Sequence, residues 1–506
     1  MNSYLRTGIA FLVASVHALA PRLCAAQDNE EHGTDSTLTY TSPQKPRYLR
    51  FALEELAILG GGVAQYWSNR DSNARDWQFK YDWASLRDRI EGKAYAFDTN
   101  GFDTNFLFHP TSGTLYYLTA RSNHLGPFES LAVAFSASFL WEFFGEFQEK
   151  PSVNDIIVTP VAGMAWGETT SQLGAFFLRA CPSTANEIAG STLAPYTALN
   201  DALDGSTRVH SDCVDGNGSA HRFRLSLSAG EAWSEGVAPY PLATIALQTE
   251  VIHVSGFGRP GKGWGTFADG NVSRLGVHVG AASAGGLSIT DFALLTQTVV
   301  AGLHYRDNYL RAGRLQRRDV LFGFMIGAEY TRHRYQPTGA ADRIFLLDLP
   351  ALTTRYYGQS QGLAWELTMD VGGSFGGADS FAQARALATG QSLSSLTSVA
   401  QAEGYNHVVG IMMSPRARLT LGPTELGMDF RSDRLIAWRA LDRTGNTSGT
   451  SVSEFRRRTS FWVSSGAPSF ARVLLGLNWT QRAGSVGDVR TSRNELALSI
   501  GLELAP

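Results

Sequence analysis

Carboxylates recur at regular spacing inside one of the most apolar stretches of this 506-residue chain. Residues 139–160 read "FLWEFFGEFQEKPSVNDIIVTP" and contain Glu142, Glu146 and Glu149, and with Ser138 they follow spacings of four, four and three. At about 100° per residue, these side chains fall within about 80° of a helix surface, which predicts one polar stripe on an apolar helix. Because a buried carboxylate is unfavourable unless it is paired or hydrogen-bonded, the stripe predicts a partner.

Three kinds of chemistry fit this stripe. In the first, Arg121 and Tyr117 of the preceding helix satisfy Glu142 and Glu146, and the cluster holds two helices together. In the second, His109 joins the two glutamates to bind a divalent cation, although the Glu-x-x-His pattern of di-iron bundles is missing. In the third, a buried glutamate with a raised pKa is a general base acting on a lipid or cell-wall fragment, with His109 as a further catalytic candidate. We expect the structural role; ligand binding or gating stays open, and neither a metal nor a cofactor is assigned.

The stripe needs helices to position it, and the sequence predicts a helical module over residues 46–180 with three to four helices. Helical spacing starts at "YLRFALEELA", and further helices are expected over residues 112–124, 128–149 and 152–180. We expect the last of these to be broken near Gly163 and Gly167, because glycine weakens a helix interior.

Composition and the N-terminal residues predict the cellular location. Residues 1–26 combine Arg6, an apolar run and the small residues "CAA", which is typical of a secretory signal peptide, and residues 27–45 are expected to be disordered. The formal net charge of −3 argues against a nucleic-acid partner. No run reaches the roughly 18 apolar residues of a membrane-spanning helix. These features predict a protein exported across the inner membrane of a Gram-negative cell.

Two cysteines remain once the signal peptide is removed. Cys181 and Cys213 flank a polar stretch with little periodicity, and an oxidising compartment favours a disulfide between them. Residues 181–213 are therefore expected to form a disulfide-closed loop.

From residue 221 to the end, apolar and polar residues alternate. The segment "NELALSIGLEL" near the C-terminus shows the period of two clearly, and such runs with their turns predict about 12 strands over residues 214–506. A soluble β-sandwich alternates in the same way. The long uninterrupted series of similar strands and the frequent glycine on the polar face favour a transmembrane antiparallel barrel of about 12 to 14 strands, with apolar side chains toward lipid. The chain has 43 Lys and Arg residues but only five Lys, which fits an Arg-rich lumen as well as codon bias.

Three strings resemble an uncharacterised bacterial family, domain of unknown function 3943. They are "DTNFLFHPTSGTLYYLTAR", "SFLWEFFGEFQEKPSVNDIIVTP" and "GMAWGE", within residues 47–180. The resemblance implies a cell-envelope protein with this helical module and implies no known reaction. The positions that match are Asn105, His109, Pro110, Gly113, Tyr117, Arg121, Trp141, Glu142, Glu146, Pro151, Ser152, Asp155, Pro160, Gly163, Gly167 and Glu168.

These observations combine into one prediction: an outer-membrane β-barrel whose helical module sits in or against the lumen as a plug. Its expected role in the cell envelope is structural or pore-like, and its expected partner is outer-membrane lipid, with a small-molecule or lipid ligand in the lumen left open. The alternative is a membrane-embedded enzyme that uses the Glu/His cluster. The predicted polar cluster comprises Tyr117, Arg121, Glu142, Glu146, Asp155 and Glu168.

Overall fold

The computed structural model describes residues 45–69, 80, 82–97, 100–205, 220–283, 287–311, 313–334, 341–379, 382, 405–438, 451–466 and 471–504. The predicted signal peptide, nearly all of the segment 27–45 and Cys213 lie outside the described residues. The pairing of Cys181 with Cys213 therefore stays a prediction.

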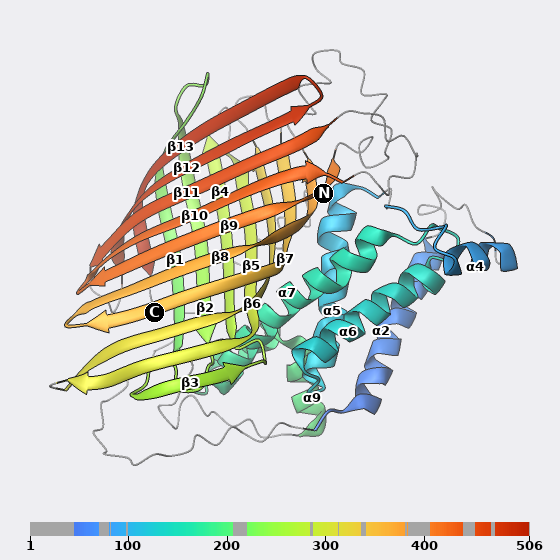
Figure 1. Ribbon diagram of the computed structural model, residues 1–506, viewed down its shortest axis with the longest axis horizontal. Coiled ribbons are helices and arrows are strands. Elements are labelled where there is room, and N and C mark those ends of the chain that lie inside the picture. The colour runs from blue at the N-terminus through green and yellow to red at the C-terminus, as the bar shows by residue number, and fades with distance from the viewer. Residues whose placement is uncertain are drawn as a thin grey trace.

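Twelve antiparallel strands close into a barrel, and a thirteenth short strand extends it (Figure 1). The last strand pairs with the first, so the ring has no open edge, and the predicted barrel of about 12 to 14 strands is confirmed. The strands of the described residues are β1 Ala220–Ser234, β2 Tyr240–Ile252, β3 Gly261–Phe267, β4 Val272–Ser283, β5 Leu287–Arg311, β6 Arg314–Arg334, β7 Ala341–Ser360, β8 Leu363–Asp379, β9 Asn406–Leu421, β10 Thr424–Ala437, β11 Val452–Gly466, β12 Arg472–Val486 and β13 Val489–Leu504.

The short strand β3 continues the line of β4 along β5. Phe267 of β3 pairs with Gly302, and Val272 of β4 pairs with Val299, so residues 268–271 lie opposite only two residues of β5. The extra residues bulge out of the sheet, as an insertion into one strand of a pair does. We call residues 268–271 the β3–β4 bulge, and the helical module contacts it.

The two faces of the barrel wall differ in polarity, as the alternation predicts. Arg431 of β10 binds Asp348 of β7 although these strands are not neighbours, which places both side chains in the lumen. Successive residues of a strand point to opposite faces. The outward positions hold exposed apolar side chains, including Leu367, Met369, Val371, Leu475, Leu498 and Ile500. An apolar exterior around a polar interior is the pattern of an outer-membrane-type barrel.

Seven α-helices precede the barrel within the described residues, more than the three to four predicted. They are α2 Tyr48–Ser68, α4 Trp83–Ile90, α5 His109–Ser122, α6 Pro127–Leu140, α7 Val153–Arg179, α8 Thr184–Leu193 and α9 Pro195–Asp204, with π-helical turns at Thr104–Phe108 and Trp141–Gly145. None of these helices is long and apolar enough to cross a membrane. Helices α8 and α9 occupy most of the segment that was expected to be a loop.

The helices pack on the outer wall of the barrel and do not fill its lumen (Figure 1). On β5, Gln297 bonds to Asp370 and Arg416 inside the barrel. The next residue, Thr298, therefore points outward, and its hydroxyl lies 2.9 Å from that of Thr169 on α7. The predicted plug is thus wrong in position. The apolar surface of the helices predicted that they are buried inside the barrel. In the structure, part of that surface packs on the outer wall of the barrel and part is exposed.

Helix α7 is continuous over 27 residues, contrary to the predicted break. Its glycines do not interrupt it because they face α5 at a point of very close packing, described next. The helix runs along the outer wall, and near the C-terminal end of α7 the ring of Phe176 packs at a tilt against that of Phe223 of β1, with 5.3 Å between centroids.

Candidate functional site

Glycines set the distance between α5 and α7. A Cβ atom on Gly113 would lie 1.8 Å from the carbonyl oxygen of Thr159, and one on Gly163 would lie 2.5 Å from the backbone of Gly113. One on Gly167 would lie 2.7 Å from the ring of Tyr117. Small residues four apart allow such close helix contact, as the G-x-x-x-G pattern does in membrane proteins. This close packing places Tyr117 beside Glu168, the residue that follows Gly167.

That residue, Glu168, is the centre of a buried polar site. Its carboxylate accepts hydrogen bonds from Tyr117 Oη at 2.6 Å, from Arg121 Nε at 2.8 Å and Nη2 at 3.1 Å, and from Gln172 Nε2 at 2.6 Å. The side chain of Glu168 is fully buried. Four donors, two of them from one guanidinium, compensate the cost of burying its charge. We call Tyr117, Arg121, Glu168 and Gln172 the Glu168 site.

The Glu168 site joins the module to the barrel. Arg121 Nη2 donates to Asp269 Oδ1 at 3.0 Å, and Gln172 Nε2 donates to the carbonyl oxygen of Asp269 at 2.8 Å. Asp269 belongs to the β3–β4 bulge. The next residue, Gly270, has φ +64°, and a Cβ atom there would lie 2.1 Å from Glu168 Oε1. Glycine is therefore required at position 270 for two reasons: the positive φ angle, and the lack of space for a side chain beside Glu168.

Two groups of the Glu168 site, Tyr117 and Arg121, have pKa values above their ordinary ones. Burial raises the pKa of Tyr117 well above its ordinary value, and the charge of Glu168 raises it further. Burial alone would lower the pKa of Arg121, but the attraction of Glu168 raises it overall. The phenol therefore stays a proton donor and the guanidinium stays charged.

The predicted partners of Arg121 were wrong, because the carboxylates of the stripe point to different neighbours. Helix α6 ends at Leu140 and gives way to the π-helical turn, so the 100° periodicity does not hold across Glu142 and Glu146. Glu142 Oε2 accepts a bond from the backbone N–H of Ser152 at 2.8 Å. Glu146 Oε1 accepts one from the indole of Trp141 at 2.9 Å.

The cation beside this turn is Arg89, which the sequence did not indicate. Its guanidinium comes from α4, is fully buried, and donates to the carbonyl oxygens of Glu142 at 2.9 Å and Phe143 at 3.1 Å. It also donates to the carbonyl oxygens of Phe147 and Glu149. A cation at the C-terminal end of a helix is favourable, because the last carbonyl groups lack helical partners.

The candidate metal or catalytic cluster is not assembled in this structure. His109 faces Asp155, with 3.7 Å between Nε2 and Oδ2, and no contact joins it to Glu142 or Glu146 among the described residues. Asp155 lies in the first turn of α7, where the hydroxyl of Ser152 accepts a bond from its N–H. In the part of the chain that is described, no group of three His, Cys, Asp or Glu residues could hold a metal ion.

Glu55 of α2 is a second residue that the sequence did not single out. It is 7% exposed, and within the described structure neither carboxylate oxygen has a hydrogen-bond partner. Burial raises its pKa from 4.5 to about 8. A neutral carboxylic acid at neutral pH is the consequence.

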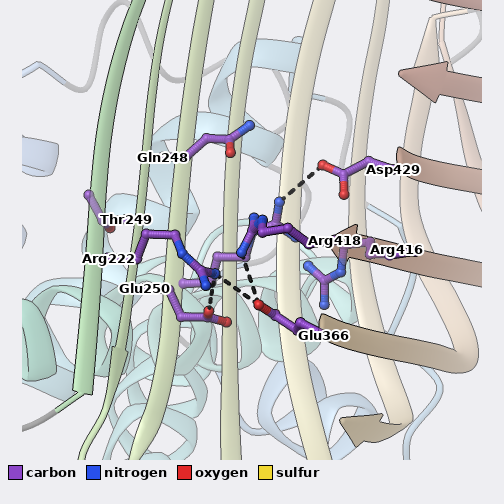
Figure 2. A pocket seen from close by; sticks show the side chains of 10 residues that line it. Arg222, Gln248, Thr249, Glu250, Glu366, Arg416, Arg418 and Asp429 are labelled. Carbon is purple, nitrogen blue, oxygen red and sulfur yellow. Dashed lines mark hydrogen bonds and ion pairs between the residues drawn. The ribbon is translucent and has the colours of Figure 1, made fainter. Parts of the chain in front are cut away.

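Ion pairs cross the barrel lumen at several levels. Around one small cavity, Arg222 Nη1 and Arg418 Nη1 each lie 2.9 Å from Glu366 Oε2, and Arg222 also lies 3.4 Å from Glu250 (Figure 2). Four arginines and three acidic residues line that cavity. The Arg-rich lumen agrees with the composition, since arginine suits confined ion pairs.

A second level lies where Arg431 binds both oxygens of Asp348 at 2.8 Å. Arg456 of β11 lies 2.8 Å from Glu329 of β6 and 2.8 Å from Asp433 of β10. At a third level, Arg482 of β12 binds Asp342 of β7 at 2.8 Å.

The segment between β2 and β3 packs on side chains of β5, β6 and β7. Phe257 packs edge to face on Tyr357 of β7, with 4.9 Å between ring centroids. The N–H of Gly258 donates to Asp319 of β6 at 3.2 Å. Side chains and a folded-in loop thus occupy the interior.

Comparison with known families and structures gives one match by sequence. Residues 94–196 match the family described as Domain of unknown function (DUF3943). The match confirms the resemblance that the motifs suggested, and it covers the helices from α5 to the start of α9, including the Glu168 site. The strands of the barrel lie outside the DUF3943 match.

Other comparisons add less. No curated protein matches the chain. Solved barrels that are similar include the NanC porin, with 6% identity over 54% of this chain and 98% of that chain at a TM-score of 0.23. The translocator domain of the autotransporter NalP from Neisseria meningitidis has 11% identity over 62% and 97% at a TM-score of 0.22. The barrel assignment rests on the closed strand order and not on these likenesses.

Proposed function

We propose that this protein is a closed, non-conducting outer-membrane barrel whose role is structural: it holds the DUF3943 helices against its lipid-facing wall. The observation that carries the proposal is the set of ion pairs that cross the lumen between strands that are not neighbours. A conducting pore needs a continuous water-filled path, and charged side chains that neutralise one another across the interior occupy that path.

The second support is the way the helices are attached. Asp269 of the β3–β4 bulge pairs with Arg121, and Gly270 lies directly against the carboxylate of Glu168, so the barrel contacts the helices at their buried ion pair. The barrel is then a scaffold for the module. An enzyme using His109, Glu142 and Glu146 is not proposed, because these side chains do not share one site.

Conductance in a planar lipid bilayer tests the proposal. Purified protein whose folding is verified by heat-modifiable electrophoretic migration is expected to give no channel steps above the bare bilayer. An outer-membrane porin measured in parallel verifies the sensitivity of the assay. Stable single-channel conductance from the folded protein would overturn the proposal.

A further inference from the structure

We propose that the outward face of the helical module is immersed in the acyl chains of the membrane, so that lipid contacts the module as well as the barrel. This outward face consists of Leu49, Leu53 and Leu56 of α2 and of Phe139, Leu140 and Phe144 at the end of α6. The inference rests on the membrane location in the proposed function and adds a partner for a surface that the barrel leaves uncovered.

Helix α2 has the reverse of the polarity that a soluble surface helix shows. Leu49 is 77% exposed, Leu53 62% and Leu56 65%, and within α2 no charged residue is exposed. The charged residues of α2 bond within the module instead: Glu55 is buried, Glu54 accepts a bond from Asn123 at 2.7 Å, and Arg50 pairs with Asp204 of α9 at 2.8 Å. A soluble helix places its charges toward water and its apolar stripe toward the core. The arrangement of α2, with apolar side chains outward and charged side chains bonded within the module, suits an apolar solvent.

The end of α6 shows the same inversion. Phe139, Leu140 and Phe144 are exposed, whereas Ser138 and Glu142 are buried. Ser138 donates from its hydroxyl to the carbonyl oxygen of Asp155 at 3.1 Å. Polar side chains therefore bond within the module while aromatic and aliphatic side chains face away from it.

The outward face continues the lipid-facing wall of the barrel. On β6, Phe322 and Phe324 are 45% and 61% exposed. Further along the same outer face, Ile326 and Ala328 are buried in the core that α7 shares with the barrel. On β7, Leu352 is exposed, while Leu347 belongs to that same core. The helices therefore cover outer-wall positions that lie directly beside the exposed, lipid-facing ones. A module at the same level of the barrel has lipid against the face that it turns away from the barrel.

Acyl chains fit this surface better than a protein partner does. Protein interfaces carry a polar rim and hydrogen bonds as well as an apolar centre. The exposed positions of α2 are Tyr, Leu, Ala, Gly and Val over most of its length, with Gln65 and Ser68 only in its last turn. An apolar patch of this extent is unfavourable in water and costs nothing in hydrocarbon.

Photo-crosslinking from single positions of the full chain tests the inference. A benzophenone amino acid is placed at Leu53 or at Phe139, and the protein is reconstituted in phosphatidylcholine vesicles. Leu498, which is 52% exposed on the outer face of β13, is the positive control, and Arg314 at the β5–β6 turn is the negative control. Lipid adducts are identified by mass spectrometry, and heat-modifiable migration verifies that each variant is folded.

The inference predicts lipid adducts at Leu53 and Phe139 in a yield comparable to that at Leu498 and well above that at Arg314. Adducts at Leu498 without adducts at Leu53 and Phe139, or adducts of those two positions with another protein chain, would overturn it. Loss of adducts at Leu498 as well would instead contradict the membrane location on which the proposed function depends.

Discussion

Arg121 of α5 and Glu168 of α7 form a bidentate ion pair, with 2.8 Å between Nε and Oε2 and 3.1 Å between Nη2 and Oε1. The pair lies between two helices and a strand bulge, and the same guanidinium reaches Asp269 of the barrel. One arginine thus links α5, α7 and the β3–β4 bulge of the barrel. Its loss would affect docking of the module and not the barrel itself.

Replacing Arg121 by Ala is expected to destabilise the docked module by about 3–5 kcal/mol, since Glu168 would keep a buried charge without its main partner. Limited proteolysis of the folded protein should then cut the helices while the barrel keeps its heat-modifiable migration. The matched control is Asp269→Asn, because Asp269 is 63% exposed in its side chain and its loss leaves Glu168 paired. Equal protease resistance of Arg121→Ala and wild type would contradict the role assigned to the pair.

Gly163→Ala is expected to separate α5 from α7, because the added Cβ would lie 2.5 Å from the backbone of Gly113. Overpacking of this kind costs about 1–3 kcal/mol and sometimes more. Thermal unfolding followed by circular dichroism at a helical wavelength measures the effect. Gly60→Ala in α2 is the control, since nothing lies within 4 Å of its Cβ position and Ala there favours the helix by about 1 kcal/mol. A Gly163→Ala protein as stable as wild type would argue against the close packing.

Glu55 predicts a pH dependence of module stability. Its pKa is about 8 in the folded protein against an ordinary value of 4.5, so the folded state retains a proton that the unfolded state releases. The free energy of unfolding should therefore fall as pH rises from about 4.5 to 8 and level off above that, with a total loss of a few kcal/mol at most. Glu55→Gln should remove this dependence and raise stability at pH 8. Glu54→Gln, one residue away, should keep it. A wild-type unfolding curve that is flat over this interval would refute the assignment.

Arg456 and Arg457 are neighbours on β11 that face opposite sides of the barrel wall. Arg456 is buried between Glu329 and Asp433, whereas Arg457 is exposed. Arg456→Ala should destabilise the barrel by about 1.5–3 kcal/mol, because Glu329 and Asp433 would lose charged hydrogen bonds while still sharing Arg431, and Arg457→Ala should change it by no more than about 0.5 kcal/mol. The midpoint of urea unfolding in detergent, read from heat-modifiable migration, compares the two. Similar midpoints for both variants would mean that the lumen ion pairs contribute little.

The barrel could be predicted from the sequence because alternation is a local signal repeated in every strand. Segments such as "NELALSIGLEL" show which residues share a face, and the count of such segments approximates the strand number. The position of the helices could not be predicted in this way, since an apolar helix is compatible with a lumen, a protein core or lipid. A sharper signal was available in α2, where Glu55 interrupts an otherwise apolar face.

The polar site was predicted only in part. The predicted cluster contained Tyr117, Arg121 and Glu168, but it also contained Glu142, Glu146 and Asp155 and lacked Gln172. Spacing along a single helix cannot rank partners on two other helices. The π-helical turn after Leu140 also rotated Glu142 and Glu146 apart, and such a turn has no reliable sequence signature. Arg89 lies in a short helix far from the motif, so only the fold brings it to the carbonyl groups that it binds.

The β3–β4 bulge has a consequence for biogenesis. The helices are synthesised before the strands, yet the residues that receive Glu168 lie some way into the barrel sequence, so docking has to wait until strands β3 to β5 have assembled. In the proposed outer-membrane location, the module would cross the periplasm with its apolar outward face uncovered. An intermediate of this kind is prone to aggregation, and binding by a chaperone would protect it until docking.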